Sequence, residues 1–153
     1  HPTTKMCLQW LATHMPARAT VLDYGCGSGI LAIAAQKLGA SQVIGIDIDP
    51  QAVTAATQNA LINDCSQIQF SLPQMLAQKT QTFEVVLANI LASPLKILAS
   101  LLAARTTGAL ILSGILQRQV EELTAAYAPY IALKVWAQDQ GWVCMVAHRS
   151  DHI

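Results

Sequence analysis

The sequence predicts an α/β fold with a doubly wound, mostly parallel sheet. Short apolar strands alternate with helical segments along the chain, which is typical of this class. With 53% hydrophobic and 12% charged residues, the chain of 153 residues can bury parallel strands on both faces. A turn with three glycines, residues 23–29, joins the first strand to a helix. One domain over residues 1–153 is therefore expected.

The chain begins with a predicted helix, followed by a strand–loop–helix unit. Apolar residues at helical spacing predict an amphipathic helix over Thr3–Thr13, which Pro16 ends. A short β-rich run follows at Thr20–Tyr24. Beyond the glycine turn, an alanine-rich helix is expected over Ile30–Leu38, with Gly39 as its C-terminal cap.

A second strand and helix complete a βαβ unit. Val43–Ile46 is an apolar strand. Asp49 and Pro50 form a typical helix start, with the carboxylate as N-cap and proline at the first helical position. This helix is expected to reach about Asn63.

The remaining elements are predicted from apolar runs and helical spacing. Ser93 and Pro94 repeat the cap-plus-proline start, for a helix that reaches about Ala104, and Ile115–Tyr127 also has helical spacing. Further strands are expected at Ile68–Ser71, Phe83–Ala88, Ala109–Leu112, Ile131–Val135 and Trp142–Ala147. Because no helical pattern separates the last two strands, they should form an antiparallel C-terminal pair at one edge of the sheet. Ligands are expected at the carboxyl ends of the parallel strands, where the winding reverses.

The glycine turn is the strongest indication of a ligand. Gly25, Gly27 and Gly29 stand at alternate positions, so the backbone can turn sharply and a ligand can lie against it. The helix that follows directs N–H groups and a partial positive charge at the turn. A turn that binds a dinucleotide would have glycine at position 30, where this chain has Ile30. A different cofactor is therefore favoured.

Two carboxylates are candidates for contact with this cofactor. Asp47 ends the second strand about 20 residues beyond the turn, where it can accept hydrogen bonds from both hydroxyls of a ribose. Asp23 ends the first strand and could bind a cationic group of the cofactor or the N–H groups of the turn itself. Asp49 already fills the cap of the next helix, so Asp47 is not needed for capping.

Residues 23–29, with the sequence DYGCGSG, resemble the first motif of class I S-adenosylmethionine-dependent methyltransferases, and Gly45-Ile46-Asp47 resembles their second. Read together, five segments resemble one family in this class, the ribosomal protein L11 methyltransferases (PrmA): residues 1–4 (HPTT), 26–34, 46–52, 88–92 (ANILA) and 112–116. The resemblance covers nearly the whole chain in matching order. It implies that residues 1–153 are the catalytic domain and that the family's N-terminal domain, which recognises the ribosomal protein, is not part of this chain.

The resemblance also implies the cofactor, the substrate and several site residues. S-adenosylmethionine is the expected methyl donor and S-adenosylhomocysteine the product. The substrate is expected to be a ribosomal protein, methylated on lysine side chains and on its α-amine. Thr4, Gly25, Asp47 and Asn89 become residues of the cofactor site, together with Asp23, Gly27 and Gly29 of the turn.

Asn89 is expected to lie beside the transferred methyl group. It ends the fourth strand, and its amide can donate and accept hydrogen bonds. Methyltransferases that act on adenine bases or glutamine amides resemble one another in having Asn-Pro-Pro-Tyr here, whereas Ile90 and Leu91 follow Asn89 in this chain. Planar substrates are therefore disfavoured. Since the sequence has no histidine or carboxylate next to Asn89, we expect no general base, and an apolar pocket would favour the neutral amine.

Composition excludes several other functions. The formal net charge of zero predicts no nucleic-acid partner, and the longest apolar stretches are too short to cross a membrane. The four cysteines form no CxxC pair, and His148 and His152 follow a predicted strand, so no metal site and a cytoplasmic location are expected. Two alternatives remain: a methyltransferase that acts on RNA, another protein or a small molecule, and a cofactor-binding scaffold without activity.

Overall fold

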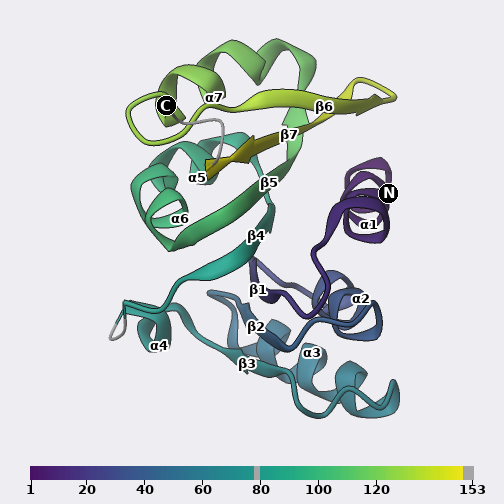
Figure 1. The fold of residues 1–153 in the computed structure, drawn as a ribbon. Coiled ribbons are helices and arrows are strands. Elements are labelled where there is room, and N and C mark those ends of the chain that lie inside the picture. The colour runs from purple at the N-terminus through teal and green to yellow at the C-terminus, as the bar shows by residue number, and fades with distance from the viewer. Residues whose placement is uncertain (78–79, 150–153) are drawn as a thin grey trace.

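A seven-stranded sheet forms the centre of the molecule (Figure 1) in the computed structural model, which describes residues 1–77 and 80–149. The strand order is β3-β2-β1-β4-β5-β7-β6. Neighbouring strands from β3 to β5 are parallel, whereas β7 is antiparallel to both β5 and β6. The predicted doubly wound sheet with an antiparallel C-terminal pair is confirmed.

The first half of the chain folds within one residue or so of the expected boundaries. Asp49 caps its helix as predicted, because its side chain accepts a hydrogen bond of 2.9 Å from the Gln51 N–H. The elements are α1 (Pro2–His14), β1 (Thr20–Tyr24), α2 (Ile30–Lys37), β2 (Gln42–Ile46), α3 (Pro50–Ile62), β3 (Gln69–Ser71) and the short α4 (Pro73–Ala77).

The second half contains β4 (Phe83–Asn89), α5 (Ala92–Ile97), α6 (Ala99–Arg105), β5 (Thr106–Leu116), a 3-10 turn (Gln117–Gln119), α7 (Val120–Tyr127), β6 (Lys134–Asp139) and β7 (Trp142–His148). Here three predictions of helices and strands were wrong in part.

The helix expected from a Ser93 cap begins earlier and is broken. Leu91 is the N-cap of α5 and Ser93 lies inside the first turn, where Pro94 is tolerated because no N–H is needed there. Leu98 then separates α5 from α6 with a backbone conformation of φ −88° and ψ 4°.

Two other segments were assigned to the wrong element. Ile115 belongs to the long strand β5, so the helix in this region covers only α7. The strand expected at Ile131–Val135 begins at Lys134 instead. Ile131 and Leu133 are buried in the core from the connection that precedes β6, so their apolar character reflects packing rather than strand pairing.

Helices cover both faces of the sheet and form two cores. In Figure 1, α1, α2 and α3 lie on one side and α5, α6 and α7 on the other. Successive residues of β1 point into different cores: Val21 packs with α1 and α2, whereas Leu22 packs with the second set of helices. This two-sided burial explains why the central strands are continuous apolar runs.

The winding reverses between β1 and β4. The chain builds β1, β2 and β3 outward in one direction and then returns to place β4 on the other side of β1. The glycine turn follows β1 and Asn89 ends β4, so both lie at this switch point. This is where a doubly wound sheet is expected to bind its ligand.

Candidate functional site

The glycine turn is held in place by hydrogen bonds to β2 and α3. The N–H groups of Gly25 and Cys26 both donate to the Ile46 carbonyl, at 2.7 and 2.9 Å. The Asn59 side chain on α3 donates to the Ser28 carbonyl at 2.9 Å. These hydrogen bonds therefore hold the backbone of the turn in one conformation.

Gly25 cannot be replaced without strain. Its φ is +82°, a conformation that side chains rarely adopt, and a Cβ at this position would overlap the Ile90 side chain. Gly27 and Gly29 also have positive φ, at +52° and +88°. The ring of Phe70 lies close below Gly29, so the turn is supported from β3.

The carboxylate of Asp47 connects the turn to the end of β2. Its Oδ2 accepts from the Gly27 N–H at 2.9 Å, and its Oδ1 accepts from the Asp49 N–H at 3.0 Å. Asp47 remains only half-buried. Because each carboxylate oxygen can accept two hydrogen bonds, Asp47 retains the capacity to bind two hydroxyl groups.

Asp23 lies beneath the turn and is almost completely buried, with 2% of its surface exposed. Its Oδ2 and the Trp10 Nε1 are the buried side-chain polar atoms without a hydrogen-bond partner among the described residues. Burial raises the pKa of Asp23 to about 7, which a backbone hydrogen bond from Ala32 at the start of α2 partly offsets. The Gly27 N–H donates to Asp47 and so is not the partner of this oxygen of Asp23.

The start of α1 is packed against the ends of β4 and β5. Asn89 Nδ2 donates to Thr4 Oγ1 at 3.2 Å, across 85 residues of sequence. Ser113 Oγ on β5 donates to the Thr3 carbonyl at 3.0 Å. Thr4 and Asn89, which the family resemblance implied as cofactor-site residues from two separate motifs, are thus in direct contact.

Two clefts open at this edge of the sheet. We call them the Asp47 cleft and the Asn89 cleft, of about 430 and 420 Å³. The Asp47 cleft is lined by Tyr24, Gly25, Asp47, Ile48, Ile90, Pro94, Ile97 and Leu98. The Asn89 cleft is lined by His1, Thr3, Thr4, Asn89, Ile90, Leu91, Gly114 and Trp142.

Ile90 lines both clefts and therefore stands between them. Its side chain lies against Gly25 of the turn, and its backbone lies so close to Gly114 that a Cβ there would overlap the Ile90 carbonyl. The mostly apolar Asp47 cleft, with one carboxylate, fits an adenosine. The Asn89 cleft combines an amide, hydroxyls and aromatic rings, so its lining can both donate and accept hydrogen bonds.

Two residues of the Asn89 cleft, His1 and Trp142, were not predicted from the sequence. His1 and Trp142 are in edge-to-face contact, with ring centroids 5.3 Å apart. The sequence offered no histidine near Asn89, but the fold brings His1 into the same cleft. His1 is the one titratable side chain among the described residues that line it. The pairing of β5 with β7, which places Trp142 opposite Leu116, was the feature that could have indicated Trp142.

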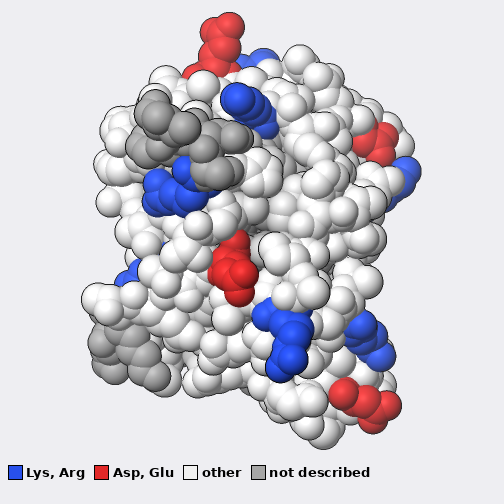
Figure 2. All heavy atoms as spheres, in the orientation of Figure 1, with Lys and Arg blue, Asp and Glu red and all other residues white. Residues whose placement is uncertain are grey.

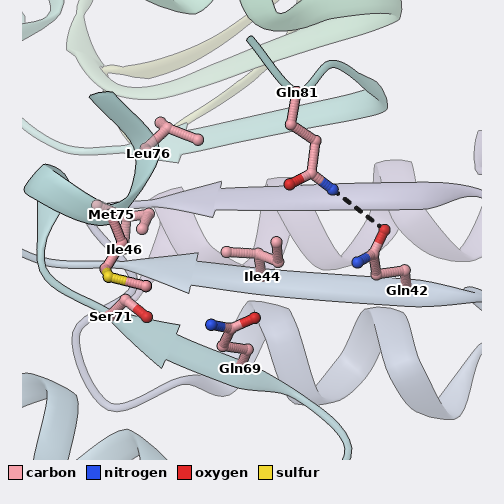
Figure 3. A pocket seen from close by; sticks show the side chains of 8 residues that line it. All are labelled: Gln42, Ile44, Ile46, Gln69, Ser71, Met75, Leu76 and Gln81. Carbon is pink, nitrogen blue, oxygen red and sulfur yellow. Dashed lines mark hydrogen bonds between the residues drawn. The ribbon is translucent and has the colours of Figure 1, made fainter. Parts of the chain in front are cut away.

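A smaller cavity of about 80 Å³ lies over β2 and β3, away from these residues (Figure 3). Gln81 donates to Gln42 across it at 3.2 Å, and Gln69 and Ile44 also point into it. None of the predicted site residues lines this cavity.

Neither a metal cluster nor a membrane-spanning helix is found in the part of the chain that the structure describes. His152 lies outside the described residues. On the face seen in Figure 2, positive and negative side chains are scattered among neutral ones, and no broad patch of one sign is visible.

The fold and the position of the site define the class of protein. A parallel sheet with this strand order, an antiparallel β7, a glycine turn after β1 and an acidic residue after β2 is the fold of a class I S-adenosylmethionine-dependent methyltransferase. Within this class, the chain belongs to the ribosomal protein L11 methyltransferase (PrmA) family, whose model matches residues 1–150. The expected class and cofactor are confirmed at the level of the family.

Relatives agree with this assignment. The ribosomal protein L11 methyltransferases of Cupriavidus pinatubonensis and of a Janthinobacterium species are each 54% identical to this chain, over 147 and 149 residues. Each comparison covers 95% of this chain and 48% of the relative, so the chain spans about half the length of these curated relatives.

Solved structures also agree in fold. A ribosomal protein L11 methylase from Lactobacillus delbrueckii subsp. bulgaricus has a TM-score of 0.90 and 34% identity, covering 96% of this chain and 78% of that one. An RNA methyltransferase from Salinibacter ruber, solved with S-adenosyl-L-homocysteine, has a TM-score of 0.73 at 17% identity, covering 96% of this chain and 90% of that one. This second likeness concerns the fold alone, because one fold can act on different substrates.

Proposed function

We propose that this chain transfers methyl groups from S-adenosylmethionine to amines of ribosomal protein L11, on lysine side chains and the α-amine. The main support for the proposal is the hydrogen bond between Asn89 and Thr4. Both residues line the Asn89 cleft, which would hold the acceptor and lies next to the glycine turn, where the cofactor would bind. Because the chain belongs to the PrmA family, ribosomal protein L11 is the favoured substrate. A cytoplasmic location is part of the proposal, since that is where ribosomal proteins are found.

The residues present fit the cofactor. Asp47 would bind the ribose hydroxyls, and the backbone of Gly25, Gly27 and Gly29 leaves room for a ligand. The buried, unpartnered oxygen of Asp23 would accept from the cofactor's ammonium group. When bound, the cofactor supplies a sulfonium-activated methyl group as the electrophile.

The acceptor side of the reaction depends on alignment and desolvation. The Asn89 amide, which donates to the hydroxyl of the cofactor-site residue Thr4, would orient the amine for in-line attack, in a cleft without a carboxylate among its lining residues. Partial burial there lowers the pKa of a lysine amine and favours its neutral, nucleophilic form. Asn89 is in this proposal the catalytic residue.

His1 is the point on which this mechanism can be tested. The expectation of no general base came from a sequence without a histidine next to Asn89, and the structure places His1 in that cleft. A pH–rate profile for the parent and for His1→Gln separates the two mechanisms. The same profile shape in both supports catalysis by desolvation. If the rate of the parent rises with pH through a titration step that is missing from the profile of His1→Gln, His1 is the general base.

Two measurements test the function itself. Calorimetry should detect binding of S-adenosylmethionine but not of NAD. Labelled methyl transfer to purified ribosomal protein L11, located by mass spectrometry, should fall steeply in Asn89→Ala but not in Asn63→Ala, an exposed asparagine at the end of α3. Labelling of RNA instead would favour the alternative substrate, and binding without turnover would favour a scaffold.

A further inference from the structure

The glycine turn needs hydrogen bonds from outside to keep its shape. Gly27 and Gly29 have φ values of +52° and +88°, which glycine adopts without strain but can also leave easily. A turn with three glycines therefore has many accessible conformations, and selecting one of them costs conformational entropy. One hydrogen bond that selects it comes from a distant part of the chain. The Asn59 side chain on α3 donates to the Ser28 carbonyl at 2.9 Å, across 31 residues of sequence.

This hydrogen bond acts on a single peptide unit of the turn, the one between Ser28 and Gly29. Its carbonyl accepts from Asn59. Its N–H, which belongs to Gly29, donates to the Cys26 carbonyl at 2.9 Å. Because the C=O and N–H of a trans peptide point in opposite directions, a hydrogen bond at one end also fixes the direction of the other. Asn59 therefore keeps the turn closed between Cys26 and Gly29.

The packing of α3 fixes the distance between Asn59 and the turn. Ala56 and Ala60 are buried, and a Cβ on Gly29 would lie 3.1 Å from the Ala56 Cβ. The helix therefore contacts the turn through small side chains. Asn59 comes three residues after Ala56, so the two lie on the same face of the helix. A side chain of the length of asparagine then reaches the Ser28 carbonyl.

Asn59 is separated from the place where the cofactor would lie. It lines neither the Asp47 cleft nor the Asn89 cleft. The same helix also supports the carboxylate of the site, since the N–H of its N-cap Asp49 donates to Asp47 at 3.0 Å. α3 thus holds two parts of the cofactor site, the carboxylate from its first residue and the glycine turn from Asn59.

Resting on the cofactor part of the proposed function, we propose that Asn59 is a positioning residue for S-adenosylmethionine. It sets the affinity for the cofactor by holding the Ser28–Gly29 peptide unit, and it contacts neither the cofactor nor the reacting atoms. Without it, glycine-flanked backbone must be ordered again each time the cofactor binds. The rate of methyl transfer from cofactor that is already bound does not depend on Asn59.

The test compares Asn59→Asp, Asn59→Ala and the control Gln58→Ala. Aspartate keeps the shape of asparagine but has no N–H, and it places a second acceptor against the Ser28 carbonyl. Alanine removes the donor alone. Gln58 is the preceding residue of α3 and has the same functional group, but it is exposed.

Three quantities are measured well below the unfolding temperature of each variant, so that a loss of stability does not enter them. The first is the Kd for S-adenosylmethionine from calorimetry. The second is hydrogen exchange of the Gly29 amide without cofactor, relative to the amides of α3. The third is kcat with purified ribosomal protein L11 at saturating cofactor. The first two do not involve an acceptor, so they test the proposal even if the acceptor is a different molecule.

We expect the Kd to rise about three- to tenfold in Asn59→Ala, as for the loss of one neutral hydrogen bond, and further in Asn59→Asp. The Gly29 amide should exchange faster in both variants, whereas the α3 amides and kcat should stay at parent values. Gln58→Ala should match the parent in all three measurements.

An unchanged Kd in both Asn59 variants, or an equal rise in Gln58→Ala, would overturn the proposal and leave the proposed function intact. A higher Kd without faster exchange at Gly29 would also overturn it, because Asn59 would then act by another route. So would a fall in kcat as large as the loss of affinity. A parent chain that does not bind S-adenosylmethionine would refute the proposed function, and this proposal with it.

Discussion

The buried carboxyl of Asp23 makes folding stability depend on pH in the direction opposite to that of most carboxylates. Burial raises its pKa from 3.8 to about 7. Between these values, the folded chain binds a proton that the unfolded chain has released. The free energy of unfolding therefore falls as the pH rises through this window. At about 1.4 kcal/mol per unit, the whole shift corresponds to roughly 4 kcal/mol as an upper estimate.

The variant Asp23→Asn removes this titration while keeping the shape of the side chain and its ability to accept from Ala32. Urea unfolding at several pH values should show a stability difference between variant and parent that grows from pH 4 to pH 7 and is constant above. The control Asp64→Asn changes an exposed acid at φ 60°, a conformation that asparagine tolerates. It should show no such dependence.

Cofactor binding gives a second readout of the same carboxyl. A cationic ligand favours the ionised form, so binding at pH 6.5 should release a proton that the Asp23→Asn variant does not release. Calorimetry in two buffers with different heats of ionisation measures this proton directly. The variant should also bind about tenfold more weakly at pH 8, since a charge-assisted hydrogen bond is lost. A stability difference that is the same at every pH would refute the reasoning, because Asp23 would then ionise normally in the folded chain.

Three further variants test the other site residues. Gly25→Ala should destabilise the chain by about 1–3 kcal/mol in urea unfolding and weaken cofactor binding, because its Cβ would overlap Ile90 at a positive φ; unchanged stability would contradict this. Asp47→Ala should weaken cofactor affinity by about 1–3 kcal/mol in calorimetry, and an unchanged Kd would remove Asp47 from the site. Thr4→Val leaves Asn89 without its partner, so kcat should fall more than cofactor affinity; an equal loss of both would assign the pair to cofactor binding alone.

The sequence predicted the position of the glycine turn and of Asp47 because these features are built from local patterns. A strand, three glycines and a helix start follow one another within residues 20–30, and each has its own physical signature. Asp47 is predicted in the same way, because it comes directly after the next strand. The side-chain hydrogen bonds that hold the turn could not be predicted in this way. Asn59 is one polar residue in a polar stretch of helix, and nothing in its sequence context indicates that it donates to Ser28.

The errors in the second half of the chain have a common cause. Helical spacing over Ile115–Tyr127 and an apolar run at Ile131–Val135 reflect burial correctly but not backbone conformation. Leu123 and Tyr127 of α7, together with Ile131, point into the same core. Since a buried connection and a buried strand have the same composition, sequence alone could not place the start of β6.

The Asn89 cleft, which we propose as the acceptor site, depends on tertiary packing rather than on a local motif. Its residues come from α1, from the end of β4, from Gly114 in β5 and from Trp142 in β7, which the sheet order brings together across more than a hundred residues. Substitutions in any one of these elements can change the lining of the cleft without altering the glycine turn or Asp47. This explains how an RNA methyltransferase can have the same fold at 17% identity. We therefore expect the substrate specificity of this chain to depend on the residues of the Asn89 cleft.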